Sequence, residues 1–162
     1  MKQAIDVPTG KIEVGSGRTI LKVNAIGSCV VVSVYSLKKK IGGLAHIMLP
    51  GESVDSKSGE ERKYAVNAID AMLKRIVFLG VDIEDIEVCM LGGANVLKRP
   101  GETIGKNNVD SIIEILRKRK IKIKAQATGG IERRSLSFDV ERGTISYTEG
   151  GEDKGLLWIA GQ

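Results

Sequence analysis

The sequence has few of the residues that cross-link small domains or stack on nucleic-acid bases. Its 162 residues include two cysteines and one histidine, and aromatic residues make up only 4% of the chain. A secreted domain held by disulfides would usually carry more cysteines, so this usage favours a reducing compartment. One histidine and two distant cysteines do not give a recognisable zinc-ligand spacing, and we expect no metal site.

Long apolar runs and a signal segment are also absent. The longest apolar stretches have the length of strands and are too short to span a bilayer. The N-terminal residues soon reach Asp6 and Pro8, and no apolar signal core follows them. The glycine pairs match neither a P-loop nor a dinucleotide fingerprint, so we expect no cofactor. These patterns predict a cytoplasmic protein without direct membrane insertion.

Positive charge is in moderate excess, with a formal net charge of +5. The basic residues gather at 38–40 and 117–124. Neither cluster is interleaved with aromatic side chains, which many nucleic-acid binders use to stack on bases. We interpret the clusters as a solvated turn and a solvated helix end, and expect no nucleic-acid partner.

The order of helical and strand patterns indicates an α/β domain. No repeat or linker divides residues 1–162, a length typical of one domain. Apolar spacing predicts a helix over 65–79 and a second helix that begins near Asn107 or Asn108. Strand patterns cover 11–14, 19–23, 30–35, 41–48, 86–91, 121–128, 134–140 and 144–148. The apolar tail at 156–159 is interpreted as a last strand, with a segment that docks a partner as the alternative. Many strands and two helices in this order favour a mixed sheet over a doubly wound parallel one.

The stretch from Asn24 to Pro50 contains the residues best suited to chemistry. Cys29 and His46 lie at the edges of two apolar, β-branched runs, and a hairpin between the runs brings thiol and imidazole to neighbouring strands. A thiolate is a strong nucleophile, and an imidazole can take its proton and later protonate a leaving group. Gly27 permits a tight turn in which amide groups near Cys29 face a developing oxyanion. This combination suits acyl transfer at an amide or ester carbonyl.

The same residue types also have an ordinary structural interpretation. Free cysteine is among the most buried residue types and usually packs as a small hydrophobe. Cys89 lies in the middle of a strand pattern and fits that description, so we interpret it as structural. For Cys29 and His46, the residues alone leave open an active site or an ordinary buried pair.

Two motifs in this stretch resemble the CheD family of chemoreceptor glutamine deamidases. They are Gly-Ser-Cys-Val-Val-Val at 27–32 and Ala-His-Ile-Met-Leu-Pro at 45–50. The resemblance continues in order through 63–65, 92–94, 104–105, 108–109, 128–130 and 134–135. It therefore extends over nearly the whole chain and identifies one CheD-like domain.

The resemblance implies a fold, a reaction and partners. The fold is a three-layer α/β/α sandwich with a mixed β-sheet, similar to the catalytic domain of cytotoxic necrotizing toxins. The reaction is hydrolysis of glutamine side chains on methyl-accepting chemotaxis receptors, through a cysteine thioester. By position, Cys29 is the implied nucleophile and His46 the implied general acid and base. A CheC-type phosphatase is the second implied partner, and a binding role toward it without chemistry is the alternative function.

Two positions depart from the family pattern: Asn107 stands where the family has an arginine, and Val23 stands where it has the third catalytic group. The family commonly carries a threonine six residues before the cysteine, where it orients the histidine, and this chain has Val23 there. We expect Asn24, Ser28 or a backbone carbonyl to orient His46 instead. Backbone amides near Ser28 and Cys29 are the expected oxyanion hole.

Overall fold

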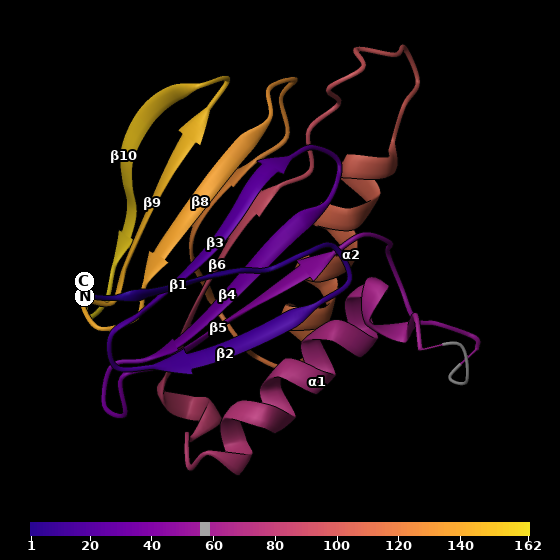
Figure 1. Cartoon of the computed structure of the whole chain (residues 1–162). Helices are drawn as coiled ribbons and strands as arrows, with labels where there is room; N and C mark the ends of the chain where they lie inside the picture. Colours follow the sequence, from indigo (N-terminus) through magenta and orange to yellow (C-terminus); the bar gives the residue numbers. More distant parts are fainter. Residues whose placement is uncertain (56–58) are drawn as a thin grey trace.

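Two mixed five-stranded sheets and two α-helices make up the computed structural model, which describes residues 1–55 and 59–162 (Figure 1). The first half contains β1 (Gln3–Asp6), β2 (Ile12–Ser16), β3 (Thr19–Ile26), β4 (Val30–Ser36), β5 (Ile41–Ile47) and α1 (Ala65–Phe78). The second half contains β6 (Ile86–Gly92), α2 (Ile104–Lys118), β7 (Ile123–Thr128), β8 (Arg134–Asp139), β9 (Thr144–Glu149) and β10 (Glu152–Ile159). One sheet has the order β2-β5-β4-β6-β7 and the other β1-β3-β8-β9-β10.

Strand β4 is the central element of the first sheet. It pairs antiparallel with both β5 and β6, and every residue from Val30 to Ser36 is buried. This agrees with the uninterrupted β-branched run in the sequence, which is typical of strands covered on both faces. Val30, Val32 and Val34 pack on the helices, while Val31 and Tyr35 face the second sheet.

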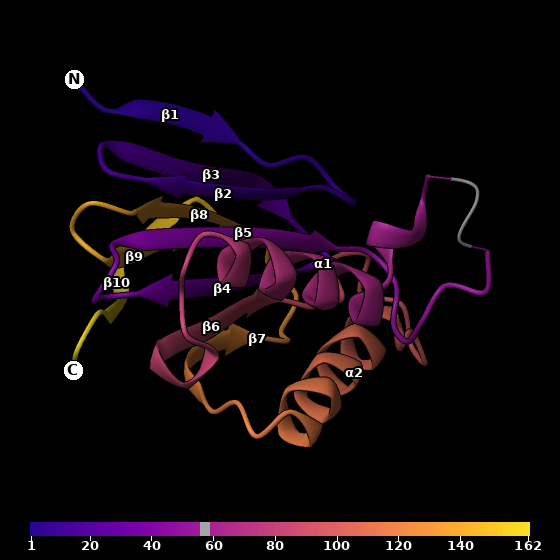
Figure 2. The same ribbon diagram turned by 90° about the horizontal axis from the view of Figure 1, so that it is seen from below.

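Both helices lie on the same face of the first sheet (Figure 2). The buried stripe of α1 and the buried residues Ile112 and Leu116 of α2 belong to one hydrophobic cluster with alternate residues of β4. The opposite face of the sheet is covered by the second sheet, where the rings of Tyr35, Phe138 and Trp158 pack edge to face.

The α/β class with mixed sheets is thus confirmed, but the layer order is helices, sheet, sheet and not α/β/α. The connections explain the difference. The crossovers from β5 to β6 and from β6 to β7 join parallel strands and advance in the same direction across the sheet. Right-handed crossovers that advance in one direction place their helices on one face. The similarity to toxin domains stays a prediction.

Most element boundaries agree with the sequence patterns, but β10 begins four residues before the predicted 156–159, β3 extends three residues beyond 19–23, and α2 begins earlier than predicted. The hairpin of β8 and β9 and the last strand, β10, are confirmed, whereas β1 was not predicted. Helix α2 begins at Ile104 with Thr103 at its N-cap, so Asn107 and Asn108 lie inside the helix. The predicted helix start near these asparagines was wrong. Among the described residues, no helix has the length and hydropathy of a membrane span.

Candidate active site

The β4–β5 hairpin brings Cys29 and His46 to the same face of the first sheet. Val31 and His46 are directly opposite in the antiparallel ladder. Cys29 precedes Val31 by two residues, so its side chain lies on the same face, diagonal to His46. Diagonal neighbours within a ladder have Cα atoms about 7–8 Å apart, and Cys29 lies one residue beyond the last pair, Val30 and Ile47. The predicted hairpin between the two residues is confirmed.

His46 is held from both sides by the segment that follows β1. Its backbone N–H donates to the Lys11 carbonyl at 3.0 Å, and its carbonyl accepts from the Gly10 N–H at 2.8 Å. Its ring Nδ1 lies 2.9 Å from the Val7 carbonyl oxygen. Because a carbonyl can only accept, this contact places the proton on Nδ1 and leaves the Nε2 lone pair free. The imidazole is therefore oriented as a base at Nε2.

The environment keeps the imidazole neutral. His46 is only 6% exposed. Burial lowers the pKa of His46 below its ordinary value of 6.5, while the Val7 carbonyl partly opposes this by favouring the charged ring. At neutral pH the ring is thus deprotonated at Nε2.

Cys29 is half-buried at the start of β4. Burial raises the pKa of the Cys29 thiol above 9.0, and hydrogen bonds from the Thr9 hydroxyl and from the cysteine's own N–H work in the opposite direction. Both groups are therefore neutral at neutral pH, Cys29 as a thiol and His46 as an imidazole.

The turn that carries Cys29 is tied down through three consecutive carbonyls. The carbonyl oxygens of Gly27, Ser28 and Cys29 accept hydrogen bonds from the Ala94 N–H (2.9 Å), the Asn108 side chain (2.9 Å) and the Gly93 N–H (2.8 Å), in that order. In a trans peptide the next residue's N–H points the opposite way. The N–H groups of Ser28 and Cys29 are therefore directed away from these partners.

The glycine pair at the end of β6 makes this close contact possible. Gly92 and Gly93 have φ of 127° and 72°, in the left-handed region that favours glycine. A Cβ on Gly92 would lie 2.3 Å from the Cys29 carbonyl oxygen. No other residue fits against the cysteine turn at this point.

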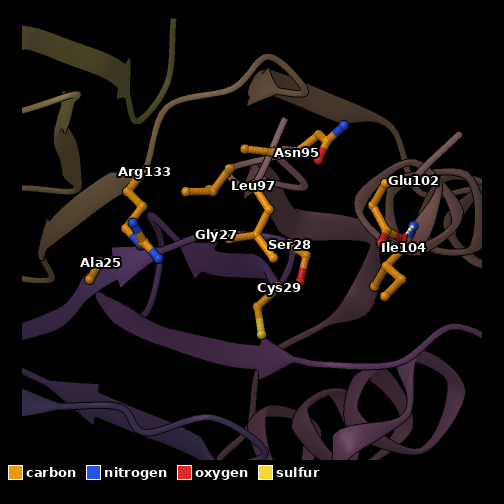
Figure 3. A pocket seen from close by; sticks show the side chains of 11 residues that line it. Ala25, Gly27, Ser28, Cys29, Asn95, Leu97, Glu102, Ile104 and Arg133 are labelled. Atoms are coloured by element: carbon orange, nitrogen blue, oxygen red, sulfur yellow. Dashed lines mark hydrogen bonds between the residues drawn. The ribbon is translucent and has the colours of Figure 1, made fainter. Parts of the chain in front are cut away.

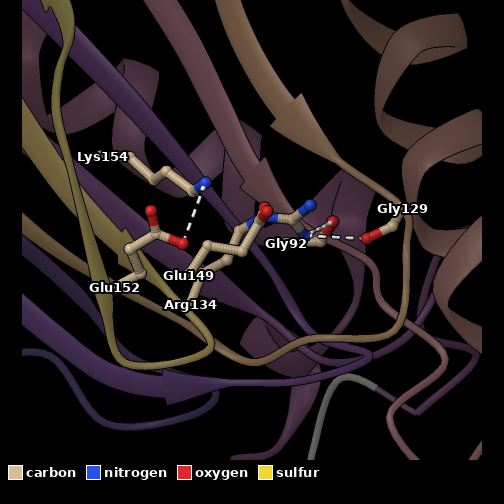
Figure 4. A network of polar contacts seen from close by, with 6 residues as sticks. All are labelled: Gly92, Gly129, Arg134, Glu149, Glu152 and Lys154. Atoms are coloured by element: carbon tan, nitrogen blue, oxygen red, sulfur yellow. Dashed lines mark hydrogen bonds and ion pairs between the residues drawn. The ribbon is translucent and has the colours of Figure 1, made fainter.

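Buried Arg134, from the second sheet, holds Gly92 and also Gly129. Its guanidinium donates to the carbonyls of Gly129 at 2.9 Å and Gly92 at 3.3 Å, and pairs with Glu149 at 2.8 Å (Figure 4). Because Arg134 is 5% exposed, its charge is compensated by these contacts and not by water. The side chain thus joins β8 to the carboxyl ends of β6 and β7, beside the cysteine turn.

A pocket of about 340 Å³ opens beside Cys29 (Figure 3). Its lining is mainly small or apolar, and Arg133 and Glu102 lie at opposite sides of it in this view. Leu97 and Ile104 are 65% and 46% exposed at its rim. The pocket can therefore take an apolar surface next to the thiol.

The other residues expected near the site, Ser28, Val23 and Asn24, lie in three different environments. Ser28 lines the pocket. Val23 is 3% exposed and packs in the cluster between the sheets. Asn24 is exposed on the other face of β3, away from that cluster. The ring contact of His46 is with the Val7 carbonyl and not with Asn24.

Sequence reasoning missed Val7, Thr9 and Asn108 as members of the site. A backbone carbonyl was among the expected orienting groups, but every residue has one, so no residue type marks Val7. Asn108 belongs to a family motif, yet its polar side chain indicated a helix cap. In residues 1–55 and 59–162, no group of three or more His, Cys, Asp or Glu side chains is arranged to hold a metal ion.

Comparison with known proteins identifies the family of this chain. The CheD family, described as CheD chemotactic sensory transduction, matches residues 48–149, a segment that begins after Cys29 and His46. A probable chemoreceptor glutamine deamidase CheD of Archaeoglobus fulgidus is 37% identical, covering 98% of this chain and 100% of the relative. A protein of the same description from Methanococcus vannielii is 34% identical, covering 94% of this chain and 99% of the relative. The chemoreceptor glutamine deamidase CheD of Thermotoga maritima is 30% identical, covering 94% of this chain and 96% of the relative. The chain belongs to the CheD family.

Proposed function

We propose that this protein is a cysteine-dependent glutamine deamidase acting on methyl-accepting chemotaxis receptors in the cytoplasm. The observation that carries the proposal is the position of Cys29 and His46 on one face of the first sheet, at the end of the β4–β5 ladder, with the proton of the neutral His46 ring on Nδ1. The names of the relatives support the substrate, because these proteins are described as chemoreceptor glutamine deamidases.

In the first half of the reaction, Cys29 attacks the carboxamide carbon of a receptor glutamine. His46 Nε2 takes the thiol proton as the sulfur–carbon bond forms, giving a tetrahedral intermediate. The intermediate collapses when the carbon–nitrogen bond breaks and the imidazolium gives its proton to the departing nitrogen. The products of this half are ammonia and a glutamyl thioester on Cys29.

In the second half, water hydrolyses the thioester. His46 Nε2 takes a proton from water as its oxygen attacks the thioester carbon, and the proton then returns to the leaving sulfur. The receptor residue leaves as glutamate, and the thiol and neutral imidazole are restored. One water is consumed for each ammonia released.

The N–H groups of Ser28 and Cys29 are the proposed oxyanion hole. The carbonyls of the same two peptides, those of Gly27 and Ser28, accept hydrogen bonds on one side of the turn. The two N–H groups therefore point to the other side. Fixed backbone donors stabilise an oxyanion without reorganisation. This arrangement supports the role, and the Gly92–Gly93 contact keeps the turn in place.

The test is conversion of glutamine to glutamate in a receptor cytoplasmic fragment, measured by peptide mass spectrometry. We expect the wild-type protein to convert selected glutamines and His46→Asn to be slower by about 10²–10⁴-fold, the usual contribution of general acid–base catalysis. The asparagine can still donate to the Val7 carbonyl but cannot accept a proton from the thiol. Conversion by His46→Asn at the wild-type rate, or no conversion by the wild type, contradicts the proposal.

Binding to a CheC-type phosphatase is the second candidate function. The observation that favours it is Val23, which is buried and carries no hydroxyl that could assist His46. A binding role predicts that Cys29→Ala retains full affinity for such a phosphatase. If receptor fragments remain unmodified while this affinity is intact, the binding function replaces the enzymatic one.

A further inference from the structure

Asn108 is a buried polar residue that the helix itself does not require. It lies in the second turn of α2 and is 0% exposed. Asparagine is a weak helix former, and a buried amide is unfavourable unless its hydrogen bonds are made. Its presence therefore calls for a specific use of its donors.

Both donors of the amide are directed at the two segments that carry the active pair. Nδ2 donates to the Ser28 carbonyl at 2.9 Å and to the Met48 carbonyl at 3.0 Å. Ser28 immediately precedes Cys29, and Met48 follows His46 by two residues. One side chain thus bridges the backbone beside the thiol and the backbone beside the imidazole.

The bridge lies where the two strands part. The last pair of the β4–β5 ladder joins Val30 to Ile47. Beyond it, the Cys29 carbonyl accepts from Gly93, and the Met48 N–H donates to Lys63 at 2.9 Å. Hydrogen-bonded pairs alternate along an antiparallel ladder, so the next such pair after Val30 and Ile47 would be Ser28 and Leu49. The Leu49 N–H donates to the Lys63 carbonyl at 2.9 Å instead, and the Ser28 carbonyl accepts from Asn108, whose amide spans the opening.

Helix α2 is fixed firmly enough for Asn108 to set this geometry. A Cβ on Gly105 would lie 2.5 Å from the Gly93 carbonyl oxygen, so the first turn of α2 packs directly on the segment that binds the Cys29 carbonyl. About one turn beyond Asn108, the Ser111 hydroxyl accepts from the Gly51 N–H at 2.9 Å. The helix is thus joined to the segments that follow β6 and β5.

The side-chain oxygen of Asn108, Oδ1, lowers the stability of the fold. This atom is buried and has no hydrogen-bond partner among the residues that the structure describes. An unsatisfied buried acceptor lowers stability. An apolar side chain of similar size would avoid this penalty, so the value of the amide must come from its two donors.

We propose that Asn108 is a positioning residue, whose amide sets the separation of the Cys29 thiol and the His46 imidazole. It touches neither reacting group and acts through the Ser28 and Met48 carbonyls. The effect on deamidation depends on the proposed function, whereas the effect on thiol reactivity does not. Because misplacement by about 1 Å can cost about 100-fold, we expect Asn108→Leu to deamidate receptors about 100-fold more slowly.

The deciding experiment is a double-mutant cycle on alkylation of Cys29 by iodoacetamide at pH 7.5, read by peptide mass spectrometry. His46→Asn removes the base beside the thiol, and we expect it to slow alkylation about tenfold in the wild-type background. In the Asn108→Leu background, we expect His46→Asn to change the rate less than about twofold. The matched control is Asn107→Leu, the same change at the neighbouring exposed position, where the tenfold effect should persist.

Each outcome decides the proposal. An equal His46→Asn effect in the wild-type and Asn108→Leu backgrounds overturns it, as does no effect in the wild type. If Asn108→Leu does not fold by circular dichroism, Asn108→Asp takes its place, because a carboxyl group keeps the shape and has at most one donor, so it cannot bridge both carbonyls. Loss of the coupling in a protein that never deamidates receptors would refute the proposed function and leave this inference standing.

Discussion

The two cysteines of this chain share one hydrophobic cluster but differ in their environment. Cys89 lies in the middle of β6, opposite Ser33 of β4, and is 2% exposed. Burial raises its pKa to about 12. Cys29 lies one residue before β4, beside a pocket, with the Thr9 hydroxyl on its thiol. The position along the strand, and not the residue type, separates a packing side chain from a candidate nucleophile.

The largest expected difference between the two cysteines is in catalysis. Cys29→Ala removes the proposed nucleophile and should slow receptor deamidation by about 10⁴-fold or more, as loss of a nucleophile does in other hydrolases. Cys89→Ala leaves a small cavity, which should cost about 1–2 kcal/mol of unfolding free energy with little change in kcat. Deamidation rates and urea unfolding of both variants measure these effects. A fully active Cys29→Ala would remove the distinction.

Thiol reactivity should distinguish the cysteines without any substrate. Only the thiolate reacts with iodoacetamide, and both the higher pKa and the burial of Cys89 suppress its reaction. At pH 8 we expect Cys29 to be alkylated at least about 100-fold faster than Cys89 in the folded protein. Because the Cys29 pKa lies above 9.0, its rate should rise with pH through that value. Equal labelling of both peptides would contradict this comparison.

Alkaline pH should destabilise the fold chiefly through Cys89. Its folded pKa of about 12 exceeds the ordinary value of 9.0, so the unfolded chain loses this proton first. The stabilisation is complete below pH 9 and declines between pH 9 and 12, by about 1.4 kcal/mol per pH unit for one proton. Urea unfolding from pH 8 to 10.5 should show a smaller decline for Cys89→Ala than for the wild type. Equal declines of the unfolding free energy in Cys89→Ala and the wild type would show that Cys89 is not the source of this pH dependence.

The smallest expected effect concerns the hydroxyl beside Cys29. Thr9→Val keeps the shape of the side chain but removes the hydrogen bond that lowers the Cys29 pKa. The pKa should therefore rise further, and alkylation of Cys29 at pH 8 should slow by about threefold, as for one modest hydrogen bond. Thr9→Ser retains the hydroxyl and should match the wild type, while Cys89 labelling should be unchanged in both. A Thr9→Val rate equal to that of Thr9→Ser would exclude this contact.

Much of the fold could be predicted from local patterns because strands and helices bury their apolar faces at fixed periods. The β-branched run at 30–35 predicted a fully covered strand, and the spacing over 65–79 predicted α1. The start of α2 could not be predicted, because Asn108 serves a distant backbone and not its own helix end. The layer order also escaped prediction, since it depends on the direction in which successive crossovers advance.

The sequence by itself determined the α/β class, the hairpin that carries Cys29 and His46, and the resemblance to CheD, because each depends on periodic patterns or short motifs that can be recognised locally. Only the tertiary structure decided what surrounds the pair: the Val7 carbonyl on Nδ1, the Thr9 hydroxyl on the thiol and the Asn108 amide between the two strands. These groups come from segments that meet only after both sheets and α2 have packed. Backbone carbonyls and buried amides leave no mark in the sequence that distinguishes them from ordinary loops and caps.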